Sequence, residues 1–244
     1  MDIKISGSGS IASGEYKEVH ISGSGRMTGL VRCDNLHVSG SARGENIECA
    51  GKIAISGSGK FSGCAKAGNV SVSGALSVDC DIDVKEKLSC SGVTNCGGSI
   101  RCANLRVSGK AVAAKDIEAE RVDVDGILNC EGLVNAEEIT IKYHSSGMEI
   151  GSIGGSNIVI CRSQNVGRSI IRLPLFSSLA NSAADSVKIK TAIEGDNIAI
   201  EGVSAERVSG RVVAIGENCK IDLVQYSEKV EISPNAKVGR QEKI

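Results

Sequence analysis

Pairs of aliphatic residues, separated by one residue, recur along the chain at a nearly constant spacing. We call the second residue of each pair the anchor. Successive anchors are 16, 17, 17, 17, 18, 17, 17 and 17 residues apart: Ile5, Ile21, Val38, Ile55, Val72, Cys90, Val107, Val124 and Ile141. The residue two positions before each anchor is aliphatic in every copy. Self-similarity at a fixed period is the signature of a repeat architecture.

Within each copy the alternation of apolar and polar residues predicts a short β-strand, with residues such as Lys4 and His20 facing outward. Glycine stands two positions after the anchor in eight of the nine copies. We expect it to turn a corner with positive φ, helped by the preceding Ser or Asp. Further inward pairs are expected at about four and six residues, and ten and twelve residues, after the anchor, as at Leu76/Val78 and Ile82/Val84.

Three short strands and three corners in about 17 residues predict an all-β fold. The specific prediction is a single-stranded parallel β-helix, or β-solenoid, with triangular coils. Stacked coils pair equivalent strands at about 4.8 Å, so equivalent side chains form ladders. Asn35, Asn69 and Asn104 recur three residues before an anchor. We interpret them as corner residues in the left-handed region, in preference to ligand groups.

Four segments are expected along the chain. Residues 1–160 form the regular β-solenoid, although Tyr143 stands where a glycine is expected. Residues 161–186 are an insertion, as a loop or short helix, residues 187–239 form less regular coils, and residues 240–244 are a polar tail. The insertion contains an apolar run that either packs across the solenoid or is exposed as a partner loop: Ile170, Ile171, Leu173, Leu175 and Phe176.

Composition narrows the function classes. The 28 basic and 29 acidic residues give a net charge of -1, and no basic stripe or aromatic interleaving indicates a nucleic-acid partner. Aromatic residues are 2% of the chain and Trp is absent, which suits a narrow interior of small side chains. No apolar run approaches the roughly 18 residues of a membrane span. The repeat starts at once at Ile3, so we expect no signal peptide and a cytoplasmic protein, with a membrane-peripheral location left open.

The ten cysteines fall mostly at inward positions, where other copies carry Ala or Val. We interpret them as small buried residues with reduced thiols, in preference to metal or redox groups. Cys90, Cys96 and Cys102 are six residues apart, which is not the spacing of a zinc site. His20 and His37 share an outward position in adjacent coils, so their rings are expected about 5 Å apart. A solvated ladder is favoured there over a metal site.

Catalytic groups are not evident. Asp79, Asp81 and Asp83 alternate along one segment and form an acidic patch, but the sequence shows no further carboxylate or basic group to make it a calcium or polysaccharide-cleaving site. The Gly-Ser-Gly segments lack the helix and lysine of a phosphate-binding loop. We therefore expect no enzyme activity, no cofactor and no bound metal.

The 17-residue repeat of paired aliphatic strands with Ser-Gly corners resembles the bactofilins, the polymer-forming cytoskeletal proteins of bacteria. The resemblance covers Ile3 to about Ile160, and more loosely Val187 to Val238, and rests on segments such as Val38-Ser39-Gly40 and Val72-Ser73-Gly74. It implies a right-handed β-helix that stacks end to end into nonpolar filaments and serves as a scaffold in cell shape or envelope organisation. The chain differs from the family in its insertion and in having no disordered tail before the first strand.

We expect the protein to associate with itself through the solenoid ends, at Ile3, Ile5 and Ile232, because an uncovered coil is a template for another coil. An envelope-associated protein is the expected kind of client. Two alternatives remain open. One is a carbohydrate-active or acyltransferase-type β-helix enzyme, and the other is a scaffold that does not polymerise and binds through residues 161–186.

Overall fold

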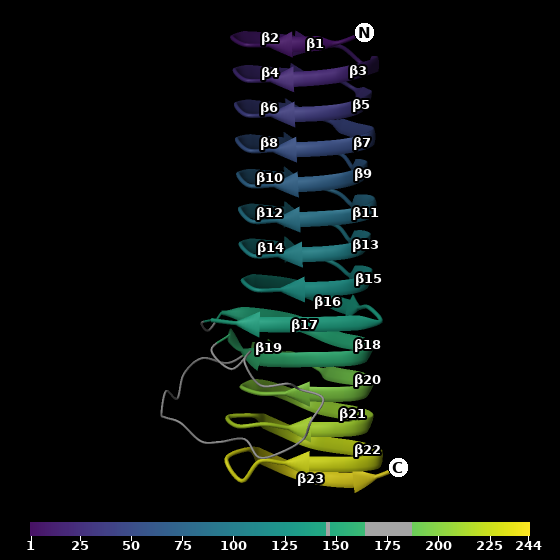
Figure 1. The fold of residues 1–244 in the computed structure, drawn as a ribbon, viewed down its shortest axis with the longest axis vertical. Helices are drawn as coiled ribbons and strands as arrows, with labels where there is room; N and C mark the ends of the chain where they lie inside the picture. The colour runs from purple at the N-terminus through teal and green to yellow at the C-terminus, as the bar shows by residue number, and fades with distance from the viewer. Residues whose placement is uncertain (145–146, 164–186) are drawn as a thin grey trace. The chain divides into compact units, whose positions relative to one another are not determined.

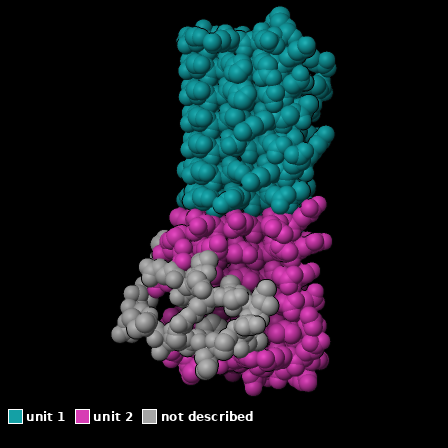
Figure 2. All heavy atoms as spheres, in the orientation of Figure 1, with its two compact units in different colours: residues 1–119 teal, residues 120–244 magenta. Residues whose placement is uncertain are grey.

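The structure, a computed structural model, describes residues 1–144, 147–163 and 187–244. The regular elements in these residues are all β-strands (Figure 1). The chain forms two compact units, Met1–Ala119 and Glu120–Ile244 (Figure 2). Each unit is a stack of parallel-paired coils, and the two hold about 13 coils between them. The all-β parallel solenoid predicted from the repeat is thus confirmed.

Fourteen strands lie wholly in the first unit, and a fifteenth contains the boundary between the units. The fourteen are β1 (Ile3–Ile5), β2 (Ser8–Ile11), β3 (Gly14–Ile21), β4 (Ser24–Met27), β5 (Leu30–Val38), β6 (Ser41–Gly44), β7 (Asn46–Ile55), β8 (Ser58–Phe61), β9 (Ala65–Val72), β10 (Ala75–Val78), β11 (Ile82–Cys90), β12 (Val93–Cys96), β13 (Ile100–Val107) and β14 (Lys110–Ala113). The boundary falls within β15 (Ile117–Val124).

Each coil of the first unit has a short strand and a long strand, instead of the three separate strands predicted. The short strand, such as β4, follows the glycine corner. The long strand, such as β5, joins the predicted third strand of one coil to the first strand of the next. Strands β5 and β7 pair at Cys33–Cys49 and again at Leu36–Ile53, with a register irregularity between the two positions. The predicted number of strands was wrong because backbone pairing continues through the corner that precedes each anchor.

The interior of the first unit consists of the predicted inward rows. From Val19 to Val107, no anchor or residue two before an anchor exposes more than 3% of its surface. Each fully buried Val, Ile or Leu contributes about 1.5–3 kcal/mol, so a ladder of such residues is the main stabilising feature of the stack. Phe61 is also fully buried. It fills the space beside Gly44, where a Cβ would lie 3.3 Å from the Phe61 ring.

The corner glycines do not have positive φ, so the reason predicted for them was wrong. Among the described residues, positive φ is confined to positions that are not corner glycines: Gly14, Gly29, Gly147, Gly202 and Asn218. A Cβ at Gly74 would instead lie 2.0 Å from the carbonyl oxygen of Gly57 in the preceding coil. The same clash, at 2.0 or 2.1 Å, recurs at each corner glycine from Gly23 to Gly109. Glycine is needed because the backbones of successive coils approach too closely for any side chain.

The corner asparagines also differ from expectation, since Asn218 is the sole non-glycine residue with positive φ in the described chain. Asn35 acts through its side chain, which accepts a hydrogen bond from the Lys52 N–H at 2.8 Å and donates one to Glu18 Oε1 at 2.8 Å. Asn69 Nδ2 donates to Glu86 Oε2 at 2.7 Å. These residues therefore connect neighbouring coils through side-chain hydrogen bonds.

Eight strands lie wholly in the second unit: β16 (Ile127–Asn135), β17 (Glu138–Tyr143), β18 (Met148–Arg162), β19 (Val187–Ile189), β20 (Ala192–Ile200), β21 (Val203–Ile215), β22 (Lys220–Ile232) and β23 (Lys237–Lys243). The anchors stay in register although their spacing varies. Ile160 pairs with Ile200, Ile200 with Ile215, and Ile215 with Ile232. The irregular spacing predicted for residues 187–239 thus lies in the connections between strands and in a register shift of the β21–β22 pair between Gly210 and Val212.

Tyr143, which replaces the expected corner glycine, exposes 3% of its surface. Burial raises the pKa of its hydroxyl above the ordinary value, because the charged form is disfavoured away from water. Residues 164–186 of the predicted insertion, with its partner-loop residues, lie outside the described residues.

Candidate functional site

The first coil of the first unit ends in an apolar layer. Ile5 and Ile11 are buried, and Ile3 is half-buried. The outward residue between Ile3 and Ile5 is Lys4, which is exposed. The inward positions of this layer carry no charge. The structure places Ile3 and Ile5, which were predicted to form a contact surface, together in this end layer.

The strands of this layer are paired on one side only within the described chain. Strand β1 pairs with β3, and β2 pairs with β4, while the Gly14–Tyr16 part of β3 pairs with β5 (Figure 1). No strand of the described residues lies beside the opposite edge of any of these segments. An unpaired edge exposes backbone donors and acceptors and is a template for another strand.

The surroundings of Gly7 show that no coil is stacked on this end within the described residues. At the next corner a Cβ on Gly23 would lie 2.0 Å from the carbonyl oxygen of Gly7, but a Cβ on Gly7 would meet no heavy atom within 4 Å. The space that a preceding coil fills at each corner from Gly23 to Gly109 is therefore open at the first. A coil from another molecule has room to stack there.

Tyr16 partly covers the end and was missed by the sequence analysis. It pairs with Cys33 in the ladder, and its hydroxyl donates to the Ala12 carbonyl at 2.8 Å. A Cβ on Gly14 would lie 3.4 Å from that hydroxyl, so the ring lies over the third side of the coil. The signal was present in the sequence, because later coils carry the smaller residues Cys, Ala or Val at this position. Strands β1 and β2 are left as the open part of the end.

The last coil of the second unit is different. Ile232 is half-buried, and β23 contains no buried residue and pairs with β22 alone in the described chain. Gln241 pairs with the buried Val224, and Arg240 Nε lies 2.9 Å from Glu242 Oε1. Charged residues on an edge oppose its pairing with another strand. The N-terminal end is therefore the better candidate for a contact.

An alternating column of charges runs along the outward face of the long strands in the first unit. Its members are in register and change sign at every coil: Glu15, Arg32, Glu48, Lys66, Asp83, Arg101 and Glu118. Arg32 Nε lies 2.9 Å from Glu48 Oε2. Opposite charges at facing positions stabilise a ladder, so this face neutralises its own charge.

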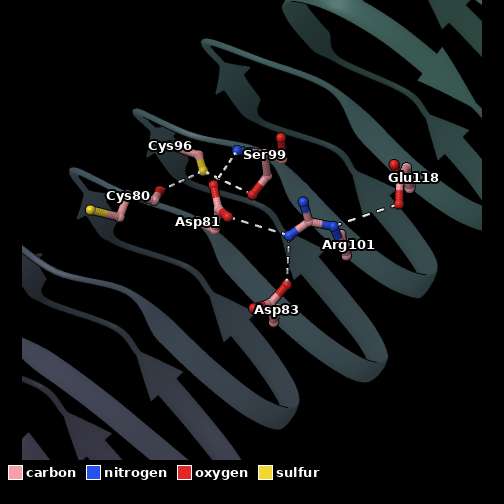
Figure 3. A network of polar contacts seen from close by, with 7 residues as sticks. All are labelled: Cys80, Asp81, Asp83, Cys96, Ser99, Arg101 and Glu118. Carbon is pink, nitrogen blue, oxygen red and sulfur yellow. Dashed lines mark hydrogen bonds and ion pairs between the residues drawn. The ribbon is translucent and has the colours of Figure 1, made fainter.

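The same column contains the most connected polar cluster of the first unit (Figure 3). Arg101 lies 3.1 Å from Asp83, 3.3 Å from Asp81 and 3.6 Å from Glu118. The Ser99 N–H donates to Asp81 Oδ1 at 2.9 Å. The sequence analysis found no basic group or further carboxylate near the acidic patch. That was wrong, because Arg101 and Glu118 come from later coils and only the stacking brings them beside Asp81 and Asp83.

Electrostatics indicate a structural role for this cluster. The Ser99 N–H, followed by Arg101, holds the pKa of Asp81 below its ordinary value, and the hydrogen bonds that Arg101 donates to Asp83 and Asp81 raise the pKa of Arg101. General acid catalysis would need a carboxyl group with a raised pKa. Asp81 is held ionised and neutralised, which suits a salt-bridge network.

The cysteines are free, and seven of the ten are buried, which confirms their expected position: Cys33, Cys49, Cys90, Cys96, Cys102, Cys130 and Cys219. Cys33 Sγ and Cys49 Sγ lie 3.0 Å apart in adjacent coils. This hydrogen bond, with burial, raises the pKa of Cys49. Cys64 and Cys161 are half-buried, and Cys80 is exposed.

His20 and His37 lie as the register predicts, with ring centroids 4.8 Å apart and ring planes at 7°. Glu18 Oε2 lies 3.8 Å from His20 Nε2 and 4.0 Å from His37 Nε2. In the described parts of the chain, no group of three or more His, Cys, Asp or Glu side chains is arranged to hold a metal ion. The metal-free expectation stays a prediction.

A second column of charges, on the short strands, was also missed. Arg26 pairs with Arg43, and Arg43 pairs with Lys60, so three cations stack in register. The sequence analysis found no basic stripe, and that was wrong. The signal was the 17-residue spacing itself, because residues 26, 43 and 60 are far apart in sequence but adjacent across coils.

No helix in the described residues is long and apolar enough to cross a membrane. Comparison with known proteins gives limited information. No family model matches the chain, and no solved structure matches it. The chain is similar to two proteins of Bacillus subtilis (strain 168) that are named only as uncharacterized. It is 28% identical to YhbF over 113 residues, 46% of this chain and 42% of that protein. It is 31% identical to YhbE over 114 residues, 46% of this chain and 44% of that protein. The aligned part therefore spans less than half the length of each relative.

Proposed function

We propose that this protein is a non-enzymatic structural scaffold that associates with itself through the N-terminal coil of its first unit. The proposal includes a bactofilin-like role, with right-handed, three-cornered coils that build oligomers or filaments in the bacterial cytoplasm. The observation that carries it is the open end of the stack, where β1 and β2 are paired on one side only in the described residues.

Three features support a contact at this end. The inward side chains Ile3, Ile5 and Ile11 are all apolar, and a stacked layer would remove the exposed part of the half-buried Ile3 from water, whereas Ile5 and Ile11 are already buried. The backbone edges of β1 and β2 have hydrogen-bonding groups that a second chain can pair. Gly7 has no heavy atom within 4 Å of its Cβ position, so the corner leaves room for a neighbouring coil.

The polar groups of the first unit favour a scaffold over an enzyme. The Arg101 cluster neutralises its own carboxylates, and burial or thiol pairing raises the pKa of the interior cysteines. A nucleophilic cysteine needs a lowered pKa, so these thiols suit packing.

Electron microscopy of the purified protein, together with light scattering over a range of concentrations, tests this function. An N-to-N contact between identical surfaces stops at a dimer, whereas a head-to-tail contact continues into filaments. Either result, with mass increasing with concentration, is expected. A protein that stays monomeric from micromolar to millimolar concentration would contradict the proposal.

A further inference from the structure

The column of Arg26, Arg43 and Lys60 is a surface whose charges are not neutralised by the protein. All three side chains are exposed on the outward face of β4, β6 and β8. Among the described residues, none of the three has an acidic side chain within ion-pair distance. Like charges at facing positions of a ladder are destabilising.

The alternating column shows that facing positions of this repeat can carry opposite charges, which avoids repulsion between neighbouring coils. On the long strands of the same unit, Arg32 faces Glu48, and Arg101 faces Asp83. On the short strands, Arg43 faces a cation on both sides. An external anion would relieve the repulsion among the three cations.

The surroundings of the column suit phosphate groups. A parallel column of serines lies two residues earlier on the same strands: Ser8, Ser24, Ser41 and Ser58. Hydroxyl groups and cationic side chains are the usual partners of phosphate oxygens. A shallow hollow lined by Arg43, Gly44, Lys60 and Ser62 lies between two of the cations.

The spacing of the cations selects a linear ligand. Successive coils are about 4.8 Å apart, so the three charges extend over roughly 10 Å along the stack. One phosphate group cannot contact all three, whereas a chain of phosphates lying along the column can. Bases would need aromatic side chains for stacking, but Phe61 of β8 is fully buried and the outward residues of β4, β6 and β8 are Ser, Arg and Lys.

We propose that Arg26, Arg43 and Lys60, with the adjacent serine column, form a binding surface for a linear phosphate polymer without bases. The polymer lies along the coil stack, and its phosphates are contacted by cations from three successive coils. This surface is separate from the strand edges of the N-terminal coil.

Fluorescence anisotropy with labelled long-chain inorganic polyphosphate tests this surface. Three phosphate contacts predict that log K falls with log [salt] with a slope of about -2, and removal of one cation should change that slope to about -1.4. Arg43→Gln and Lys60→Gln are expected to show this change, with melting temperatures near that of the unmodified protein. Lys87→Gln removes the same charge from an exposed position on the long strand β11, between Asn69 and Asn104, and should leave the slope unchanged.

Several outcomes would overturn the assignment. If Lys87→Gln weakens binding as much as Arg43→Gln, net charge alone attracts the polymer. If orthophosphate at equal phosphate concentration displaces the polymer, the surface binds single anions. Tighter binding of single-stranded RNA would identify a nucleic-acid surface. Binding of anionic phospholipid vesicles without binding of polyphosphate would identify a membrane surface.

Discussion

Gly74 stacks on the carbonyl group of Gly57, which occupies the place of a Cβ: an added Cβ would lie 2.0 Å from the oxygen. The Ala75 N–H donates to the same carbonyl at 2.9 Å, and the Gly74 N–H donates to the Ile55 carbonyl at 3.1 Å. Hydrogen bonding thus pulls successive corners together to a distance that only glycine permits. The glycine column is a consequence of close stacking.

This relationship predicts different effects for the same substitution at two corners. Gly74→Ala should lower the free energy of unfolding by about 3 kcal/mol, because the backbone of one coil must move away from the other. Gly7→Ala should change it by less than about 0.5 kcal/mol, because nothing lies within 4 Å of its Cβ position. Urea unfolding of both variants measures the difference, and equal effects would show that the carbonyl contact is not the cause.

The alternating column predicts that the sign of a charge matters more than its presence. Arg101→Glu places a carboxylate between Asp83 and Glu118 and should destabilise the first unit by about 1 kcal/mol at low salt. Lys87→Glu makes the same change of charge at an exposed position whose partners on both sides, Asn69 and Asn104, are uncharged, so it serves as the control. The difference between the variants should shrink in 1 M salt because charges are screened. A difference that does not depend on salt would indicate a packing effect.

Thiol accessibility should follow burial. A thiol reagent applied to the native protein should label Cys80 first and Cys64 and Cys161 more slowly, while the seven buried cysteines stay protected. Denaturation should expose all ten. Mass spectrometry of the labelled peptides gives the order. Rapid labelling of Cys33 or Cys49 in the native state would show that the second and third coils open readily.

Alkaline pH should destabilise the protein through the same thiols. Burial raises the pKa of Cys102 from 9.0 to about 12, and of Cys96 and Cys219 to about 11. Below pH 9 both folded and unfolded states keep these protons, so the stabilising effect is complete. Between pH 9 and about 12 the unfolded state loses protons that the folded state keeps, so stability should fall as pH rises.

Thermal melts across this range should therefore slope downward above pH 9, and less steeply for Cys102→Val, which removes one titrating group. Leu105→Val alters a neighbouring buried position without removing such a group and should keep the original slope. Identical slopes for the two variants would argue against thiol ionisation as the cause.

Much of the fold could be predicted because its main interactions are periodic. The spacing of residues such as Val38 and Ile55 identifies both the inward ladder and the coil length, and the structure confirms them. The cause of the glycine column could not be predicted, since it depends on the position of a carbonyl in another coil. Arg101 lies 18 residues beyond Asp83, so its contact follows only from the register. Residues 26, 43 and 60 could have been found by comparing outward positions at the repeat spacing.

The candidate site was predicted only in part. Ile3 and Ile5 were placed on the end layer by the repeat alone, but Tyr16 and the charged last strand modify the two ends differently. Such features occur once in the chain and have no counterpart in other coils. A periodic pattern carries no information about them.

Sedimentation velocity of Ile3→Lys tests self-association most directly. Ile3 is half-buried in the end layer, so a lysine there places a charge against any stacked coil while the remaining coils keep their packing. Lys4→Glu, on the outward face of the same strand, is the matched control, and circular dichroism should show both variants folded. We predict oligomers for the unmodified protein and Lys4→Glu, and monomers for Ile3→Lys. Oligomers of unchanged size and affinity in Ile3→Lys would contradict association through the N-terminal coil.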